Sequence, residues 1–138
     1  MNEKMPMVNR IIKRGEVYHA NLDDATGHEQ KNDKDTERRS VVVVSNNKQN
    51  EHSKVVVIVP LSSKVHNIKP SFQAPTFFQG IAGKAKCEQV RCIDVERLLG
   101  EKRGDLTENE MEMIEKKLMV VLDLLKYLGR TESRRKSF

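Results

Sequence analysis

Residues 39–60 read RSVVVVSNNKQNEHSKVVVIVP, and this stretch decides the fold. Two runs of β-branched residues, Val41–Val44 and Val55–Val59, are separated by a polar segment, and Pro60 follows the second run. Short, nearly continuous runs of this kind are typical of strands that are buried on both faces. We therefore expect them to be the two central strands of a sheet.

Two further segments predict strands on either side of this pair. Gly15–Leu22 alternates between two faces and predicts a short first strand. Gly80–Gly83 breaks the pattern, and Ala85–Ile93 then predicts a third strand. This strand carries three polar side chains close together: Glu88, Gln89 and Arg91. A strand of this composition is either an exposed edge or the floor of a polar site.

One convincing helix is expected, from Thr107 to Gly129. Thr107 and Glu110 have the spacing of a capping box, and Gly129 is a typical C-terminal stop. An apolar stripe recurs at helical spacing: Met111, Ile114, Leu118, Val121, Leu122, Leu125 and Leu128. The predicted fold is mainly β with α, a small, partly closed β-barrel with this C-terminal helix packed on it.

The chain of 138 residues suffices for one core, so we expect a single domain over residues 11–129. Residues 1–10 would form a short extension, and the basic segment 130–138 would be a disordered tail. The formal net charge is +5, of which the tail holds +3 (four basic residues against one acidic), leaving +2 for the body. Net charge alone is therefore a weak argument for a nucleic-acid partner.

Targeting and metal signals are missing from the sequence. No apolar run is long enough for a signal peptide or a membrane span, so we expect a cytoplasmic protein without membrane contact. Cys87 and Cys92 fall within one predicted strand with side chains on opposite faces, which excludes a disulfide between them. No histidine pair accompanies them, so we expect no zinc site and no other metal.

Candidate catalytic residues surround the polar stretch Asp23–Thr36, which we expect to be a solvated and mobile loop. His28 and Glu29 lie within it, and Arg38 and Arg39 stand at the mouth of the first valine strand. A general acid or base, a carboxylate and a phosphate-binding cation can thus meet where a loop joins a buried strand. This combination suits RNA cleavage.

The order of the motifs resembles the MazF/PemK (Kid) family of toxins over about residues 11 to 128. Five motifs carry the resemblance: Lys13-Arg14-Gly15-Glu16-Val17-Tyr18, Gly27-His28-Glu29-Gln30, Arg39 before a valine strand, Val59-Pro60-Leu61-Ser62-Ser63, and Glu88-Gln89-Val90-Arg91-Cys92-Ile93-Asp94. It implies an SH3-like (CcdB/PemK-like) barrel and a homodimer. It also implies the toxin of a type II toxin–antitoxin system, a ribosome-independent endoribonuclease that cuts single-stranded mRNA at short sequences.

The partners that the resemblance implies are RNA and a cognate antitoxin of the MazE/PemI type, whose disordered acidic tail occupies the RNA groove. DNA would be contacted only through the antitoxin complex. Cleavage without a metal or other cofactor uses the ribose 2′-OH as nucleophile and leaves 2′,3′-cyclic phosphate and 5′-OH ends. The protein must then move two protons and stabilise a doubly charged phosphorane.

The resemblance also implies roles for individual residues. Arg39 matches the essential arginine, whose planar fork suits a phosphate. Ser62 matches the threonine of MazF-like members, and His28, Lys86 and Glu88 match the residues of Kid-like members. The predicted catalytic residues are Arg39, Ser62, His28 and Glu88. The predicted RNA-binding residues are Glu29, Gln30, Arg38, Ser63, Lys64, Lys86 and Gln89.

Structural roles compete with these assignments. His28 could be a solvated turn residue, Arg39 could anchor a carboxylate, and Ser62 could merely end a strand. Glu88 and Arg91 could form an ion pair that holds the sheet. Aromatic residues could stack on a base or cover the barrel end: Phe72, Phe77 and Phe78.

The sequence departs from the family pattern at two places. Ser40 stands where the family has a proline, and the loop before Arg38 is longer than usual. The loop could reshape access of the substrate.

Two other functions are alternatives to a nuclease. One is a barrel that binds RNA or protein without cutting it. The other is a gyrase poison of the CcdB type, which shares the barrel but lacks the arginine motif.

Overall fold

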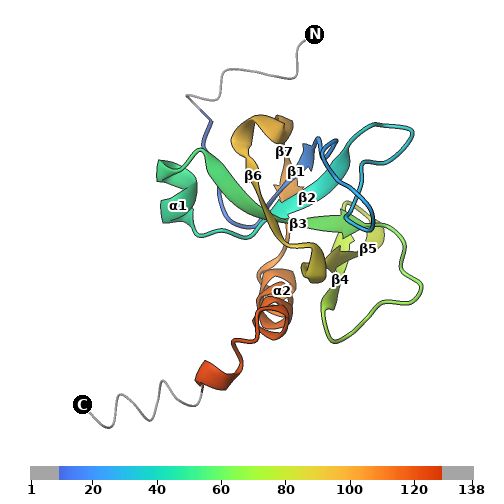
Figure 1. Ribbon diagram of the computed structural model, residues 1–138, viewed down its shortest axis with the longest axis vertical. Helices are drawn as coiled ribbons and strands as arrows, with labels where there is room; N and C mark the ends of the chain where they lie inside the picture. The colour runs from blue at the N-terminus through green and yellow to red at the C-terminus, as the bar shows by residue number, and fades with distance from the viewer. Residues whose placement is uncertain (1–9, 129–138) are drawn as a thin grey trace.

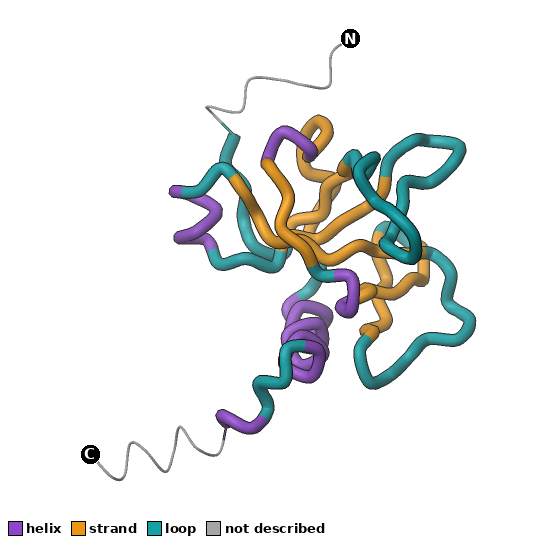
Figure 2. The backbone as a smooth tube through the Cα atoms, viewed as in Figure 1, coloured by secondary structure: helices purple, strands orange, loops and turns teal. Residues whose placement is uncertain are grey.

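The computed structural model describes residues 10–128, and they form an antiparallel sheet with short helices at its edges and a longer helix at its end (Figures 1 and 2). The strands are β1 (Glu16–Ala20), β2 (Arg39–Val43), β3 (Val55–Ser62), β4 (Gln73–Phe78), β5 (Ile81–Lys86), β6 (Arg91–Asp94) and β7 (Leu98–Asp105). The helices are α1 (Asn47–His52), the 3-10 turns η2 (Cys87–Gln89) and η3 (Val95–Arg97), and α2 (Glu108–Val121). None of the described helices could span a bilayer. The predicted mainly β architecture with a terminal helix is confirmed.

The strands follow the order β4-β5-β3-β2-β1-β7, and β6 pairs with the first half of β3. The long strand β3 therefore has two partners on the same side, because β5 pairs with its last residues, Leu61 and Ser62. The predicted strands at Gly15–Leu22, Val41–Val44 and Val55–Val59 are all present as β1, β2 and β3. β3 is the element that connects the two halves of the sheet.

Two hydrophobic clusters lie on opposite faces of β1, β2 and β3, which explains the unbroken valine runs. Val42 and Val59 belong to one cluster, which α2 covers with Met111 and Ile114. The other cluster contains the alternate residues of the same strands: Tyr18, Ala20, Val41, Val43, Val56 and Ile58. The central strands are thus buried on both faces, as predicted.

The predicted single strand Ala85–Ile93 is wrong. The chain leaves β5 at Lys86, makes the 3-10 turn η2, and begins β6 at Arg91. Because β5 and β6 pair with opposite ends of β3, a turn is needed between them, and Val90 N–H closes it on the carbonyl of Cys87 at 3.2 Å. Cys87 is buried and Cys92 exposed, and both thiols are free.

The predicted break at Gly80–Gly83 is also wrong, except at Gly80. Residues 81–83 belong to β5. Gln79 and Gly80 have φ values of 50° and 78°, and they form the two-residue turn of a hairpin between β4 and β5. Positive φ at both central positions matches the right-handed twist of the strands. Gly83 lies inside β5, where a Cβ atom would stand 2.6 Å from the backbone oxygen of Ser62.

Helix α2 begins as predicted, with Thr107 and Glu110 forming the capping box, but it ends at Val121. Asp123 has a φ of 57°, its N–H bonds to the carbonyl of Val120 at 3.1 Å, and Leu124 N–H bonds to that of Met119 at 2.7 Å. This is the Schellman arrangement, with aspartate in the position usually held by glycine. The predicted apolar stripe therefore stops, and three of its members are half exposed: Leu122, Leu125 and Leu128. Gly129, the tail 130–138 and residues 1–9 of the predicted extension 1–10 lie outside the described residues.

Candidate active site

The register of the sheet aligns polar side chains of three strands on one face. β2 pairs with β3 through Val41 and Pro60, and the same register continued by two residues sets Arg39 opposite Ser62. On the other side of β3, Ser62 pairs with Lys84 of β5. Directly opposed residues of antiparallel strands point to the same face. Arg39, Ser62 and Lys84 therefore form a row across β2, β3 and β5.

The loop 21–38 between β1 and β2 contacts the residues around this row. The Nε of Arg39 donates to the backbone oxygen of Lys31 at 2.9 Å. Lys86, two residues after Lys84, donates from Nζ to the side-chain oxygen of Gln30 at 2.8 Å. The loop was predicted as a solvated segment, and its side chains are indeed largely exposed, but its centre is held against the sheet by these bonds.

Gln89 of η2 holds the same part of the loop by its backbone. Its side-chain oxygen accepts from the N–H of Gln30 at 3.0 Å, and its Nε2 donates to the carbonyl of His28 at 3.2 Å. The amide thus uses its acceptor and one of its two donor hydrogens on neighbouring peptide groups. Gln89 was predicted to bind RNA; the structure shows that it positions Gln30, and through Gln30 the ammonium of Lys86.

Glu88 is placed by a buried neighbour. Gln73 of β4, only 4% exposed, donates from Nε2 to the carboxylate of Glu88 at 2.8 Å and accepts from the N–H of Lys69 at 2.9 Å. Glu88 also acts electrostatically on Lys86, where its charge raises the pKa of the ammonium against the larger effect of burial. A fixed carboxylate therefore lies beside a cation at the edge of the row.

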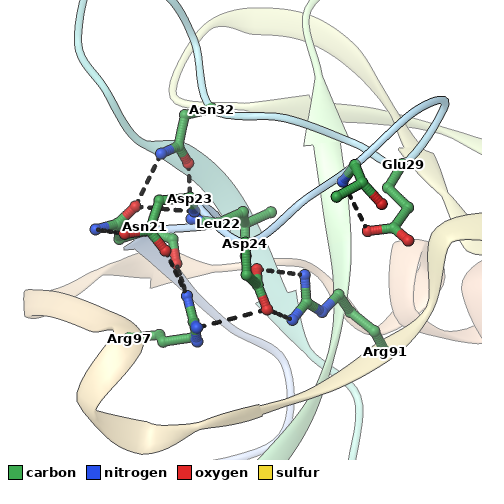
Figure 3. Close-up of polar contacts among 9 residues, drawn as sticks. Asn21, Leu22, Asp23, Asp24, Glu29, Asn32, Arg91 and Arg97 are labelled. Atoms are coloured by element: carbon green, nitrogen blue, oxygen red, sulfur yellow. Dashed lines mark hydrogen bonds and ion pairs between the residues drawn. The ribbon is translucent and has the colours of Figure 1, made fainter.

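A set of ion pairs, which we call the Asp24 clamp, ties the start of the loop to β6 and η3 (Figure 3). Arg91 donates to both carboxylate oxygens of Asp24, at 3.1 and 2.8 Å. Arg97 reaches Asp23 at 3.0 Å and Asp24 at 3.4 Å. The hydrogen bond from Arg91 is the main cause that lowers the pKa of Asp24. The clamp consists of Asp23, Asp24, Arg91 and Arg97.

Two hollows flank the loop. A cavity of about 610 Å³ is lined by Arg38, Arg39, Ser62 and Ser63, together with His19, whose Nδ1 lies 3.3 Å from a guanidinium nitrogen of Arg38. A second hollow of about 540 Å³ is lined by two carboxylate and two amide side chains of the predicted set: Glu29, Glu88, Gln30 and Gln89. Eight predicted site residues are thus gathered in two neighbouring hollows on either side of the loop.

The cations of the site are poorly solvated. Burial is the main cause that lowers the pKa of Arg39, and the charge of Asp33 opposes it. Burial also lowers the pKa of Lys86, and the charges of Lys84, Arg39 and Lys64 lower it further. Desolvated cations that repel one another favour the approach of an anion, because the anion replaces the lost water and offsets their mutual repulsion.

The structure does not bring every predicted residue into the site. His28 is exposed and lines neither hollow; only its backbone carbonyl is engaged, by Gln89. Lys64 is exposed, and its N–H donates to the Oγ of Ser62 at 3.1 Å. The ion pair considered between Glu88 and Arg91 is absent from residues 10–128, since Arg91 binds Asp24. These residues also contain no group of three or more metal-ligating side chains.

Three residues of the site were missed by the sequence analysis: His19, Gln73 and Lys84. His19 lies on β1 and meets Arg38 only through the pairing of β1 with β2. Gln73 lies on β4, a strand that was not predicted. Lys84 had the clearest signal, because it stands two residues before Lys86 and so shares a face with it on any strand.

A family model described as "PemK-like, MazF-like toxin of type II toxin-antitoxin system" matches residues 13–122. The chain belongs to this family. A curated relative, Endoribonuclease MazF9 of Mycobacterium tuberculosis, is 33% identical over 123 residues, which is 83% of this chain and 98% of the relative. The predicted family and the enzyme class of its relatives are confirmed.

Solved structures of the family show the same fold. An endoribonuclease from mycobacterial species superimposes with a TM-score of 0.65 at 23% identity, covering 84% of this chain and 95% of that one. MazF from Deinococcus radiodurans gives 0.70 at 21% identity, covering 83% and 99%. A further mycobacterial endoribonuclease, solved with its cognate antitoxin, gives 0.63 at 24% identity and covers 82% and 96%. The predicted PemK/MazF-like fold with its terminal helix is confirmed.

Proposed function

We propose that this chain is the toxin of a type II toxin–antitoxin pair and acts as an endoribonuclease on single-stranded mRNA. Its family and the name of its curated relative support this proposal. The observation that carries the chemistry is the cavity that Arg39 of β2 and Ser62 of β3 line together, which brings a guanidinium and a hydroxyl into one wall.

Arg39 would stabilise the charge that develops on the phosphate. During attack of the ribose 2′-OH, the phosphorus passes through a state with two negative charges, and a guanidinium can bond two of its oxygens at once. One donor of Arg39, its Nε, is already used on Lys31, so the two terminal nitrogens remain for the phosphate. Ser62 would donate a hydrogen bond to the same phosphate, because its Oγ accepts from the N–H of Lys64 and leaves the hydroxyl hydrogen available.

Glu88 is the best-placed proton carrier of the predicted set. Its carboxylate is oriented by Gln73 and lies in the hollow beside Gln30, whereas the imidazole of His28 lines neither hollow. We propose that Glu88 accepts the proton of the 2′-OH and that Gln30, Arg38, Ser63 and Lys86 contact the RNA. Glu29, Lys64 and Gln89 would contact it at the margin. The leaving 5′-oxygen would take its proton from solvent water, so that the products carry 2′,3′-cyclic phosphate and 5′-OH ends.

The partner in this proposal is an antitoxin whose acidic tail lies over the same cations. Antitoxin complexes are known for several structural neighbours, and the positive charges around Arg39, Lys84 and Lys86 suit a polyanionic or acidic segment. A homodimer, and DNA contact only through the antitoxin complex, belong to the same proposal.

Cleavage of a long RNA in EDTA tests the function. Wild type, Arg39→Ala, Arg39→Lys, Ser62→Ala and Glu88→Gln would be compared, with the exposed α1 variant Lys48→Ala as the control for loss of one positive charge. We expect cuts with 2′,3′-cyclic ends, a loss of about 100-fold or more for Arg39→Ala, and no loss for the control. Binding without cuts would contradict the nuclease and leave a binding module; inhibited gyrase with intact RNA would leave a gyrase poison.

A further inference from the structure

Lys84 is a largely buried lysine that forms no ion pair within the described fold. The residue is only 9% exposed. Across residues 10–128, its ammonium takes part in none of the hydrogen bonds or ion pairs. No fully buried side-chain nitrogen among these residues lacks a hydrogen-bond partner, so the ammonium keeps contact with water while the stem of the side chain is covered. The ammonium is therefore available to a ligand.

The position of Lys84 places it beside the proposed reaction centre. It pairs directly with Ser62, and Ser62 stands between it and Arg39 in the row across the three strands. Neighbouring strands are about 4.8 Å apart, so Lys84 is about two strand spacings from Arg39 at the backbone. Lys84 and Lys86 are two residues apart on β5 and therefore share one face of the sheet.

Cations outnumber carboxylates around Lys84. Glu88 acts on Lys86, but its carboxylate is already bonded to Gln73, and Asp33 acts on Arg39. Four cations, Arg39, Lys64, Lys84 and Lys86, thus stand near two carboxylates. An anion from outside the chain would supply the missing acceptor, and the spread of the cations over three strands suits a ligand with several phosphates rather than one.

We propose that Lys84 binds an RNA backbone phosphate adjacent to the one held by Arg39. This inference rests on the proposed function, since RNA is the polyanion that the site would cleave. Lys84 strengthens binding of the RNA on the side of the site toward β4 and β5. Because its ammonium forms no ion pair within the described fold, removal of the charge weakens RNA binding without destabilising the free protein.

Two substitutions at this position separate charge from packing. Lys84→Met keeps the length and the apolar stem but removes the ammonium, and Lys84→Arg keeps a positive charge. Lys48→Met, on the exposed surface of α1, is the matched control for loss of a lysine. The probe for binding is a random-sequence 2′-O-methyl RNA, which cannot be cleaved because its 2′-oxygens are blocked. Affinity is measured over a series of salt concentrations, and thermal unfolding is measured on the same samples.

For Lys84→Met we expect about tenfold weaker binding at low salt and a salt dependence whose slope is smaller by about 0.7, the loss of one single-strand phosphate contact. The unfolding temperature should stay equal or rise. Lys84→Arg should restore the slope, and Lys48→Met should match wild type. Affinity and slope unchanged in Lys84→Met would overturn the inference, as would a lower unfolding temperature with an unchanged slope.

The failure of this inference differs from the failure of the proposed function. If wild type cleaves unmodified RNA while Lys84→Met retains the wild-type affinity and slope, the function stands and the role of Lys84 is wrong. If wild type neither cleaves unmodified RNA nor binds the modified RNA, the proposed function itself is wrong, and the role of Lys84 as a contact to its substrate is overturned with it.

Discussion

The guanidinium of Arg91 holds the carboxylate of Asp24 through two parallel hydrogen bonds, of 3.1 and 2.8 Å, across 67 residues of sequence. This bidentate pair, reinforced by Arg97, fixes the start of the loop that carries Gln30 and Lys31 to the side chains of Lys86 and Arg39. A loop between two strands is thereby held in one place without a hydrophobic anchor at its centre.

Asp24→Asn should reduce RNA cleavage several-fold while the protein stays folded. The amide cannot accept two charge-assisted bonds from Arg91, so the loop loses its fixed start and Gln30 its position over Lys86. Glu37→Gln, in the same loop and exposed, removes the same charge without touching the clamp. Rates of cleavage, with circular dichroism as the folding check, measure both. Equal rates for the two variants would show that the clamp does not position the site.

The stabilisation supplied by Asp24 should depend on pH in one direction. Arg91 depresses the pKa of Asp24 in the folded state, so the pair contributes above the unfolded pKa of about 3.9 and is lost as pH falls through the lower folded value. The pair is partly exposed, so we expect about 0.5–1 kcal/mol at neutral pH. Urea unfolding of wild type and Asp24→Asn should differ at pH 7 and converge in strong acid. A difference that grows toward acid would refute this.

Gln89→Leu should lower cleavage more than it lowers stability. Leucine keeps the bulk of the side chain but leaves the N–H of Gln30 and the carbonyl of His28 without their partners. Gln89→Glu retains an acceptor for Gln30 and places a negative charge against the carbonyl of His28, so it should be intermediate. Steady-state rates would be compared with unfolding free energies. A drop in rate that only matches the fraction unfolded would mean that Gln89 merely supports the fold.

Gly83→Ala should destabilise the protein by about 1–3 kcal/mol, because its Cβ would stand 2.6 Å from the backbone oxygen of Ser62 and 3.3 Å from the Oγ1 of Thr76. The backbone of β3 must shift to admit it, and Ser62 shifts with it. Ala82→Ser, on the exposed neighbouring residue, is the control. Chemical denaturation of both variants checks the result. Wild-type stability in Gly83→Ala would show that β5 and β3 are not this close.

The two cysteines should react at very different rates. Burial is the main cause that raises the pKa of Cys87 to about 12, whereas the Cys92 side chain is exposed. The thiolate is the reactive form, so one equivalent of thiol should be titrated in the native protein at pH 8 and two after denaturation. Cys92→Ser should remove the fast equivalent. Two fast equivalents in native protein would contradict the buried position of Cys87.

The central strands and the start of α2 could be predicted because local signals decide them. The runs Val41–Val44 and Val55–Val59 have no alternative to a doubly buried strand, and Thr107 with Glu110 is a capping box in sequence and in space. The end of α2 could not be read in the same way. Asp123 adopts the left-handed backbone conformation that glycine favours, and the residue type gives no clear signal of a helix end at this position.

The site residues that could be predicted are those that lie at strand ends or in recognisable sequence motifs. Arg39 and Ser62 come together because β2 and β3 pair, and that pairing was expected. The contacts of Gln89 and of Lys86 depend on the path of a 3-10 turn and of a long loop, which no periodicity describes. Lys84 was overlooked because burial of a charged side chain runs against the usual expectation for its residue type.

The double burial of β2 has a consequence for how the chain finds its fold. Four consecutive valines present the same side chain to both clusters, so a slip of β2 against β3 by one residue costs little in hydrophobic contact. The correct alignment must then be selected by the polar groups at the strand's end. Ser45 does this: its hydroxyl accepts from the N–H of Val57 at 3.0 Å and binds the buried side chain of Asn50. The hydrogen bonds of Ser45 therefore specify a register that the four valines alone do not.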